Sequence, residues 1–486
     1  MPATPRPLIQ FQYLSTRNNV QFTIDTMPIA QYRDPVTKVG MDMSFDQNSK
    51  SRSQQKNSNR RDFLRTGTAI STAAAVSLTA THQVHSQTKA KAGEPVRIGV
   101  IGCGGRGGGA TNDNLTINEN VRLVAMADLY PAKCERLRAG MAQRHGKKVA
   151  VEANKIHGGL EGYKKVLADK DVDLVLLTTS PGFRPYHISE AVEAGKHVFA
   201  EKPSCVDPAG YRVCVDAHEK AEANGTAIVT GTQYRRQPNY IEAIKKIHAG
   251  EIGDIVSATT RYCSSGIWYR PRKDGMSDTE YQLNNWMHFV WLSGDQITEQ
   301  AVHNIDTINW VMQGPPESAY GSGGRFTRPE DSEMWDNISL DYRYPGNKIL
   351  SFMCRQIPGT RGDNGNVIYG TEATAVIHAI SRGSQIFDRD GKEIWSMKGD
   401  IGAAYRQEHR DLVDSIQAGT PIVELKETAA SSLTAVMGRM AAYTGDLVSW
   451  DFVTKTSTLD LYPKDLAWEG GRPEWRHAVP GVDKLI

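Results

Sequence analysis

Three glycines give the clearest chemical signal in this sequence of 486 residues. Gly102, Gly104 and Gly107 form the pattern G-x-G-x-x-G. In a dinucleotide site the first glycine permits a tight turn, the second lets the backbone approach a pyrophosphate, and the third allows close packing of a helix on a strand. The helix that follows directs its N–H groups and positive dipole end at the phosphates. A glycine-rich turn without a ligand can have the same composition, so the flanking elements decide between the two.

An acidic residue stands at the spacing that such a site requires. Asp128 follows the apolar run 121–127 and lies 21 positions after Gly107. A carboxylate there can accept hydrogen bonds from the hydroxyls of the adenosine ribose, and its charge would repel a 2′-phosphate. The glycines and Asp128 therefore predict NAD as the cofactor, in preference to NADP.

The elements that must position these residues alternate between strand and helix. Expected strands are Val96–Ile101, 121–127, 172–178, 198–200 and 227–230, and expected helices are Pro131–His145, 161–170, 187–194 and 209–224. This alternation predicts an α/β Rossmann domain, with a doubly wound parallel sheet, over residues 95–232. Ligands bind such sheets at the carboxyl ends of the strands. Those ends carry Gly102, Asp128, Thr179, Ser180, Pro181, Glu201 and Lys202.

After about residue 233 the pattern changes to strands joined by short turns. Expected strands are 255–262, Asn337–Tyr344, 348–354, 366–370, 374–380 and Ser384–Phe387, and expected helices are 238–249, 404–418 and 428–443. Adjacent strands with short turns predict an α+β domain over residues 233–450 with a large, mostly antiparallel open sheet. The stretch 264–285 is expected to be a long loop near the substrate, and residues 451–486 form a tail.

Several blocks of the sequence resemble the Gfo/Idh/MocA oxidoreductase family. They are VIGCGGRG at 100–107, the pair Pro181 and His187, AGKHVFAEKP at 194–203 and EQAVHNID at 299–306. The resemblance covers nearly everything from about residue 95 to 450. It implies a Rossmann domain followed by a sheet domain, with one sheet face over the catalytic cleft. The other face is commonly used for contacts between subunits, so a homo-oligomer is expected.

The resemblance implies that Lys202 and His303 are the catalytic residues. A cation at position 202 would lie beside the nicotinamide and could bind and polarise a substrate oxygen. An imidazole, with an ordinary pKa near ~6.5, suits a proton acceptor from a sugar or cyclitol hydroxyl. Helical spacing over 298–312 predicts Glu299, His303 and Asp306 on one face. Relatives often have Asp where Glu299 stands, which leaves the contact of Glu299 with substrate open.

Further site residues are expected on the same grounds. Aromatic faces pack against sugar C–H groups, and arginine donates several fixed hydrogen bonds. The expected substrate-binding residues are Glu299, Asp306, Tyr234, Arg235 and Trp286. The expected cofactor-binding residues are Gly102, Gly104, Gly105, Arg106, Gly107, Asp128, Thr179, Ser180, Pro181, His187, Glu201 and Lys202. His187 could equally be a packing residue. No metal site is expected, because the six cysteines show no C-x-x-C pair and no zinc-like spacing.

These residues predict an NAD(H)-dependent oxidoreductase that moves a hydride between the nicotinamide and a sugar or cyclitol hydroxyl or carbonyl. One alternative is a glycoside hydrolase of the same superfamily, which uses bound NAD transiently. That branch tends to depart from the Glu201-Lys202-Pro203 block, which is intact here. A second alternative is a non-catalytic NAD-binding sensor, and the presence of Lys202 and His303 counts against it.

Composition excludes several other classes of protein. Lys plus Arg number 57 against 55 for Asp plus Glu, so the formal net charge of +2 argues against binding nucleic acid or an anionic membrane through bulk charge. Hydrophobic residues make up 39% and charged residues 23%, as in soluble globular domains. Neither a membrane bundle nor a disordered chain is expected.

Residues 1–90 are expected to be a leader. Arg60 and Arg61, followed by Phe63 and Leu64 and a mild apolar stretch at 67–80, resemble a twin-arginine export signal. That stretch is too short to span a bilayer core of ~30 Å. We therefore expect export by the twin-arginine machinery to the periplasm or beyond, or a cytoplasmic protein if the signal is not functional.

Two further expectations follow from this leader. Such signals lie near the start of a chain, so translation is expected to begin at Met41 or Met43, which would make 1–40 an annotation artefact. This export route carries proteins that fold in a reducing cytoplasm, so the six cysteines are expected to be buried free thiols.

Overall fold

The computed structural model describes residues 93–471 and 476–486, and these form two sheets within one compact unit. The predicted leader, including Arg60, Arg61 and the alternative starts at Met41 and Met43, lies outside the described residues, so it stays a prediction. Within the described ranges, no helix is both long and apolar enough to cross a membrane.

The first sheet is the predicted Rossmann sheet, with six parallel strands in the order β3-β2-β1-β4-β5-β6. The strands are β1 Val96–Ile101, β2 Val121–Asp128, β3 Ile156–Gly158, β4 Leu174–Leu177, β5 His197–Ala200 and β6 Ile228–Thr230. The strand order reverses between β1 and β4, and ligands of open α/β sheets bind beyond the strand ends at such a point. Strand β3 was not predicted, because its sequence Ile-His-Gly has no apolar run.

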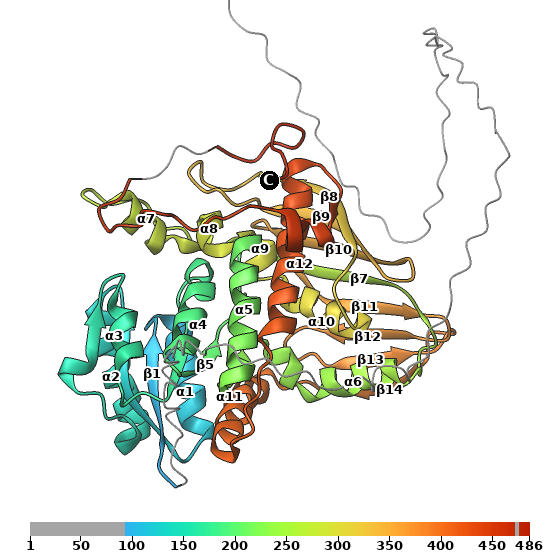
Figure 1. Ribbon diagram of the computed structural model, residues 1–486. Coiled ribbons are helices and arrows are strands. Elements are labelled where there is room, and N and C mark those ends of the chain that lie inside the picture. Colours follow the sequence, from blue (N-terminus) through green and yellow to red (C-terminus); the bar gives the residue numbers. More distant parts are fainter. Residues whose placement is uncertain (1–92, 472–475) are drawn as a thin grey trace, which may run out of the picture. The chain divides into compact units, whose positions relative to one another are not determined.

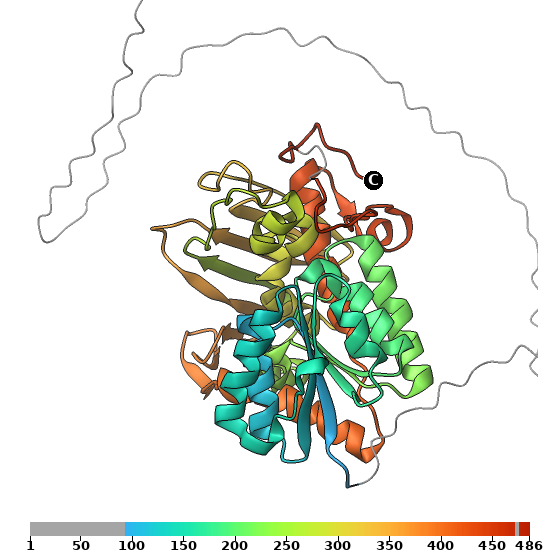
Figure 2. The same ribbon diagram turned by 90° about the vertical axis from the view of Figure 1, so that its left-hand side faces the viewer.

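Five helices from the same stretch of the chain flank this sheet: α1 Gly105–Ile117, α2 Pro131–His145, α3 Gly162–Ala168, α4 Arg184–Glu193 and α5 Pro208–Asn224. Local sequence sets their ends. The Asp207 side chain accepts a hydrogen bond from the Gly210 amide and so caps α5, Pro208 begins the helix, and Gly225 ends it at a φ of 67°. Figure 2 shows helices on both sides of the strands, as a doubly wound sheet requires.

The second sheet has nine strands in the order β14-β13-β12-β11-β7-β10-β9-β8-β15. They are β7 Ile255–Ser264, β8 Ser318–Gly324, β9 Asn337–Tyr344, β10 Lys348–Gln356, β11 Asp363–Gly370, β12 Thr374–His378, β13 Ser384–Phe387, β14 Glu393–Met397 and β15 Val448–Ser449. Its pairs are antiparallel except for β7 with β10, which confirms the predicted mostly antiparallel sheet. Strand β9 buries alternate residues, so one face packs on the core and the other is open.

Helices late in the sequence pack against both sheets. Helix α11, Ile401–Ala418, packs against α1 and against β5 and β6 of the Rossmann sheet, and adds Leu412 and Ile416 to the core there. Helix α12, Leu425–Thr444, packs against α5 on one side and β8 on the other (Figure 1). Because α12 is buried along most of its length, it joins the two sheets through a shared apolar layer.

The other α-helices of the described residues are α6 Pro238–His248, α7 Asp278–Asn284, α8 Val290–Ser293, α9 Asp295–Glu299 and α10 Val302–Met312. The prediction of one continuous helix over 298–312 was wrong. Helix α9 ends at Glu299 and α10 begins at Val302. Between them the Gln300 side chain accepts a hydrogen bond of 2.6 Å from Gln356 of β10. The helix therefore breaks where Gln300 contacts the second sheet, and the hydrophobic periodicity of the local sequence does not reveal this break.

All six cysteines are buried and free, as predicted. Burial raises the pKa of the thiols of Cys205, Cys214 and Cys354. A thiol with a raised pKa forms little of the reactive thiolate at neutral pH, so these three cysteines pack as small apolar side chains.

A glycine in α12 allows that helix to lie close against the second sheet. A Cβ at Gly438 would overlap the hydroxyl of Tyr342, which is fully buried and donates to the Thr434 carbonyl. We expect Gly438→Ala to lower the free energy of unfolding by about 1–3 kcal/mol through overpacking.

Gly140→Ala is the matched control for this prediction. Gly140 also lies in a helix, and an added Cβ there meets no atom within 4 Å. Alanine should therefore raise the free energy of unfolding by roughly 0.5–1 kcal/mol. Urea unfolding followed by circular dichroism measures both changes, and equal effects at the two positions would contradict the close approach.

Candidate active site

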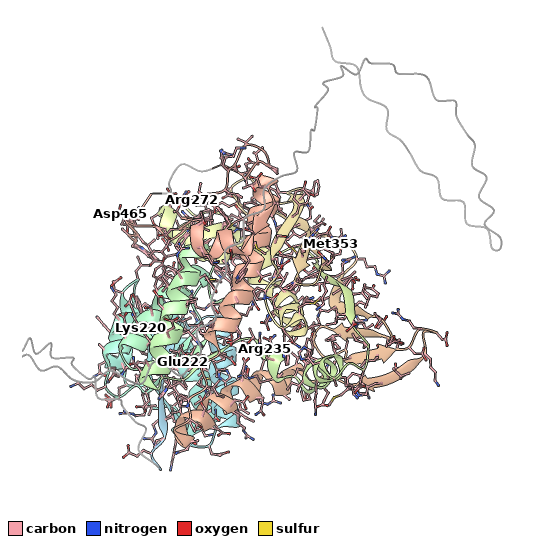
Figure 3. All side chains as sticks on the ribbon, turned by 45° about the vertical axis from the view of Figure 1, so that its right-hand side comes forward. Lys220, Glu222, Arg235, Arg272, Met353 and Asp465 are labelled. Carbon is pink, nitrogen blue, oxygen red and sulfur yellow. The ribbon has the colours of Figure 1, made fainter. Side chains whose placement is uncertain are left out.

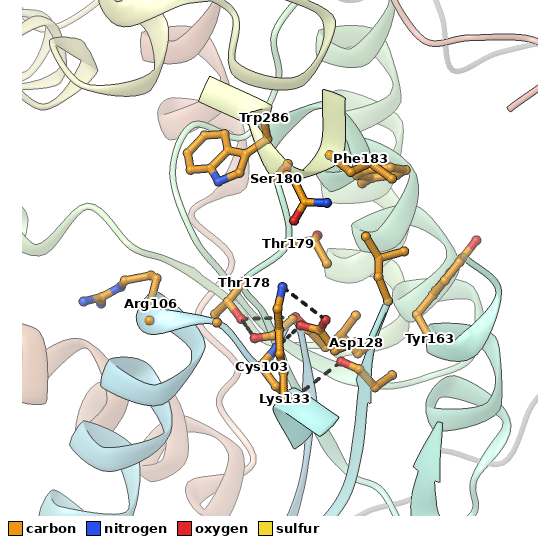
Figure 4. Close-up of a pocket in the computed structure, with 18 of the residues that line it drawn as sticks. Cys103, Arg106, Asp128, Lys133, Tyr163, Thr178, Thr179, Ser180, Phe183 and Trp286 are labelled. Carbon is orange, nitrogen blue, oxygen red and sulfur yellow. Dashed lines mark hydrogen bonds and ion pairs between the residues drawn. The ribbon is translucent and has the colours of Figure 1, made fainter. Parts of the chain in front are cut away.

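Two adjoining cavities lie at the carboxyl ends of the Rossmann strands. The larger, of about 630 Å³, runs past β1, β2 and β4 (Figure 4), and the smaller, of about 240 Å³, surrounds Lys202. They share the wall residues Arg106, Thr178, Thr179 and Trp286. The larger cavity has the size of a small-molecule or cofactor site. A ligand in it can therefore reach a second ligand in the smaller one.

The glycine loop forms the floor of the larger cavity. Gly102 has a φ of +97°, and a Cβ there would lie 2.8 Å from the Thr178 carbonyl carbon. A Cβ at Gly107 would overlap the carbonyl oxygen of Gly102, so both positions require glycine. At Gly104 an added Cβ meets no protein atom within 4 Å, which fits a backbone that a ligand approaches closely. Helix α1 begins at the next residue, and no side chain caps its N-terminus.

Asp128 closes the far end of the same cavity. Its carboxylate accepts hydrogen bonds from the amides of Cys103, at 2.8 Å, and Tyr130, at 3.0 Å, and lies 3.6 Å from the ammonium of Lys133. These contacts fix the carboxylate at the end of β2, next to the glycine loop, as the sequence predicted for a ribose ligand.

The charge of the larger cavity also fits a dinucleotide. Four basic side chains line it, those of Arg106, Lys133, Arg136 and Arg270, against the single carboxylate of Asp128. A dinucleotide carries two negative charges on its pyrophosphate, and an excess of cations attracts such a ligand. The residues present therefore fit NAD.

The smaller cavity holds Lys202 against Glu299. The Lys202 ammonium donates to the Glu299 backbone oxygen at 2.5 Å and to its carboxylate at 2.9 Å. Lys202 follows β5 of the Rossmann sheet, whereas Glu299 ends α9 of the second domain. The ion pair therefore joins the Rossmann domain to the second domain beside the smaller cavity.

His303 lies beside this pair in the first turn of α10. Its pKa is lowered well below the ordinary value, first by burial and then by the nearby positive charges of Lys202 and Arg106. Within the described residues its Nδ1 is buried and has no hydrogen-bond partner. A neutral imidazole that lines the cavity is able to accept a proton.

Two family models match the chain. "Oxidoreductase family, NAD-binding Rossmann fold" matches residues 96–228, and "GFO/IDH/MocA C-terminal domain" matches residues 240–376, together more than half of the chain. The chain belongs to the Gfo/Idh/MocA oxidoreductase family. Its first domain is accordingly an NAD-binding Rossmann domain, and the protein is an oxidoreductase.

Relatives in this family include dehydrogenases of cyclitols. The inositol 2-dehydrogenase of Rubrobacter xylanophilus is 23% identical over 289 residues, which span 59% of this chain and 73% of that protein. The inositol 2-dehydrogenase of Salmonella typhimurium is 26% identical over 218 residues, 45% of this chain and 54% of that protein. The chain thus matches only about half the length of the Salmonella enzyme.

Solved structures show the same fold. Apo scyllo-inositol dehydrogenase from Lactobacillus casei has a TM-score of 0.56 at 17% identity, over 73% of this chain and 98% of that one. A levoglucosan dehydrogenase in complex with NADH and levoglucosan has a TM-score of 0.58 at 17% identity, over 73% and 99%. Both likenesses confirm the predicted fold.

Most of the predicted cofactor residues line the two cavities. Those on the larger cavity are Gly102, Gly104, Gly105, Arg106, Asp128, Thr179, Ser180 and His187, and those on the smaller one are Arg106, Thr179, Pro181, Glu201 and Lys202. Gly107 lies behind the loop, where it permits the close packing described above. His187 packs against Tyr163 and Phe183, and burial lowers its pKa to about 3.

The predicted substrate residues divide into two groups. Glu299 and Trp286 line the smaller cavity. Arg235 and Asp306 instead bind each other at 2.8 and 2.9 Å and line neither cavity, and Asp306 also accepts from Ser431. Asp306 lies in the same helix as His303 but binds Arg235 and Ser431, so it does not share the cavity-facing surface of Glu299 and His303.

Tyr234 also lies behind the cavity, with a structural contact on each side. It is buried, stacks on Tyr240 and accepts a hydrogen bond from the Ile380 amide. Its ring centre lies 5.3 Å from that of His303. Tyr234 can therefore support His303 from behind.

Several cavity residues have no signal in the local sequence. Tyr405 of α11 lines the smaller cavity, and the Arg106 guanidinium lies 4.5 Å from the centre of its ring. Burial raises the pKa of Tyr405 to about 12, and its hydroxyl accepts a hydrogen bond from the Gln233 side chain. Arg106 also forms an ion pair with Glu201. Only the return of α11 to the Rossmann sheet brings Tyr405 to this place.

Metal ligands do not gather anywhere in the part of the chain that the structure describes. There, no group of three or more His, Cys, Asp or Glu side chains could hold a metal ion.

The glycine loop gives a direct test of the cofactor site. Gly102→Ala would strain a positive φ and push a methyl group at the Thr178 backbone, so we expect NAD to bind about tenfold more weakly or worse. Gly108→Ala is the control, because its Cβ makes only an ordinary contact of 3.5 Å with Leu137. Isothermal titration with NAD measures both variants, and unchanged affinity in Gly102→Ala would contradict this assignment.

Proposed function

We propose that this oxidoreductase oxidises a hydroxyl group of a cyclitol or sugar and transfers the hydride to NAD, or catalyses the reverse reaction. The placement of Lys202, Glu299 and His303 around one small cavity that shares a wall with the cofactor cavity carries this proposal. The inositol and levoglucosan dehydrogenases among its relatives support the substrate class.

In the proposed mechanism, the chain's own residues hold the substrate and move one proton. The Lys202 ammonium donates to the reacting substrate oxygen and stabilises negative charge on it. The neutral His303 imidazole accepts the hydroxyl proton during oxidation and returns it during reduction. Bound NAD supplies the hydride acceptor.

The walls of the smaller cavity support a polyol as substrate. Trp286 offers an aromatic face to C–H groups, while Gln233 and Tyr405 offer an amide and a hydroxyl that are hydrogen-bonded to each other at 3.3 Å. A volume of about 240 Å³ favours a small ligand such as a single ring. Export through the twin-arginine machinery to the periplasm and assembly into a homo-oligomer remain proposals that rest on the sequence.

A panel of cyclitols and sugars with NAD, read by absorbance of NADH, tests the function. Against the best substrate, Lys202→Met should lower kcat/KM about 10²–10⁴-fold, because the group that binds the reacting oxygen is lost. Lys220→Met is the control, since Lys220 is an exposed residue that pairs with Glu193 away from both cavities. A Lys202 variant as active as the control would contradict the mechanism.

The same panel separates the alternatives. Release of an aglycone from a glycoside without net NADH would identify the transient-redox glycoside hydrolase. Binding of NAD and sugar without either reaction would point to a sensor. Both outcomes would overturn the proposed dehydrogenase.

The lowered pKa of His303 predicts the pH profile. The base acts in its neutral form, and a pKa below the ordinary value keeps it neutral as the pH falls through ~6.5. We therefore expect kcat/KM for oxidation to stay level between about pH 8 and 6 and to fall only at lower pH. An acid limb with an inflection at or above about 6.5 would contradict the assignment of a buried neutral base.

A further inference from the structure

The segment 264–286 forms a wall of the cofactor cavity opposite the glycine loop. Five of its residues line that cavity, namely Trp268, Arg270, Leu283, Asn284 and Trp286. Only Trp286 also lines the smaller cavity. The sequence predicted a long loop near the substrate over 264–285. Residues 278–284 form helix α7 instead, and four of the five lining residues line only the larger cavity.

A line of contacts along this wall runs from Trp286 to Asp128. Trp286, which lines both cavities, lies 6.3 Å from Trp268 between ring centres. The Arg270 guanidinium lies 4.4 Å from the ring centre of Trp268, and its Nη1 donates to the Asn284 carbonyl at 2.7 Å. The backbone of Arg270 is held on both sides by the Asn285 side-chain amide.

The line of contacts ends at Asp128, the carboxylate that the sequence predicts to bind the adenosine ribose. The Asn284 amide donates to the Tyr130 hydroxyl at 2.9 Å, and the Tyr130 backbone amide donates to the Asp128 carboxylate at 3.0 Å. In this line of contacts Arg270 stands between Trp286, which lines both cavities, and Asp128. In a dinucleotide, the pyrophosphate is the part between the nicotinamide and the adenosine ribose.

Arg270 brings an uncompensated charge to this position. In the described residues no carboxylate pairs with it, whereas Arg272 of the same segment pairs with Asp278. Trp268, on which the guanidinium rests, is 39% exposed, which is unusual for a large aromatic side chain. A ligand in the cavity would cover both groups.

The C-terminal tail holds the segment in place. Ser277 donates to the Trp468 carbonyl, and the Thr279 amide donates to that of Gly470. The Trp468 ring packs edge-on against Tyr130 at 5.8 Å. Figure 3 shows Arg272 of the segment and Asp465 of the tail on the same side of the molecule.

We propose that Arg270 binds the pyrophosphate of the dinucleotide from the side opposite the glycine loop, with the segment 264–286 as the second wall of the cofactor site. The glycine loop offers backbone N–H groups and Arg270 offers a guanidinium, which can bind phosphate oxygens through two parallel hydrogen bonds. This role concerns cofactor binding and holds whichever substrate the enzyme uses.

Titration with ADP-ribose tests this role without involving the reaction. ADP-ribose carries the pyrophosphate but no nicotinamide, and its binding is measured by isothermal titration. Arg270→Ala should weaken binding about tenfold or more, as expected for the loss of a charge-assisted contact. Arg270→Lys keeps the charge but loses the two parallel hydrogen bonds, so its affinity should lie between those of the parent and of Arg270→Ala. Lys273→Ala removes the same charge from an exposed position of the segment outside the cavity and should change nothing.

Thermal unfolding without ligand checks that each variant is folded. The proposal is overturned if Arg270→Ala binds ADP-ribose as well as Lys273→Ala does. Failure of the parent chain to oxidise any polyol would contradict the proposed function. It would not affect the test of Arg270, because the affinities for ADP-ribose are measured without the reaction.

Discussion

The contact between Lys202 and Glu299 is the constraint on which the proposed site depends. One partner follows a Rossmann strand and the other ends a helix of the second domain, so the site exists only while the two sheets keep their relative position. Helix α12 secures that position, because it is buried against α5 on one side and β8 on the other. Burial of apolar side chains thus keeps the two sheets in a fixed relative position. Because that position is fixed, the ion pair with Glu299 holds the Lys202 ammonium group in one place.

Around this contact, two arginines are matched with carboxylates. Arg106 is held by Glu201 and the ring of Tyr405, and Arg235 is held by Asp306. Removing a charge from water costs free energy that a partner must offset, so each pair has a fixed geometry. The pairs that do not line a cavity, such as Arg235 with Asp306, therefore hold the framework behind the site. The side chains that do line it are left to face ligands.

Much of the Rossmann domain could be predicted because its signals are local. The apolar run of β1, the glycine spacing and Asp128 each follow from the chemistry of a few neighbouring residues. Strand β8 could not be predicted, since its sequence Ser-Ala-Tyr-Gly-Ser-Gly-Gly has no strand pattern and is held by pairing with β9. Tyr405 was missed for a related reason. It reaches the cavity only because α11 folds back onto a sheet formed by residues far earlier in the chain.

The ammonium group of Lys202 shows how the site can be both preformed and open to substrate. It has three N–H donors. The Glu299 backbone oxygen and carboxylate accept two of them, so both the main chain and the side chain of one residue fix its direction. One donor is left for a substrate oxygen in the cavity that His303 also lines. A hydroxyl placed there donates its proton toward the neutral imidazole while its oxygen accepts from Lys202, and this is the arrangement that removal of a hydride from the adjoining carbon requires.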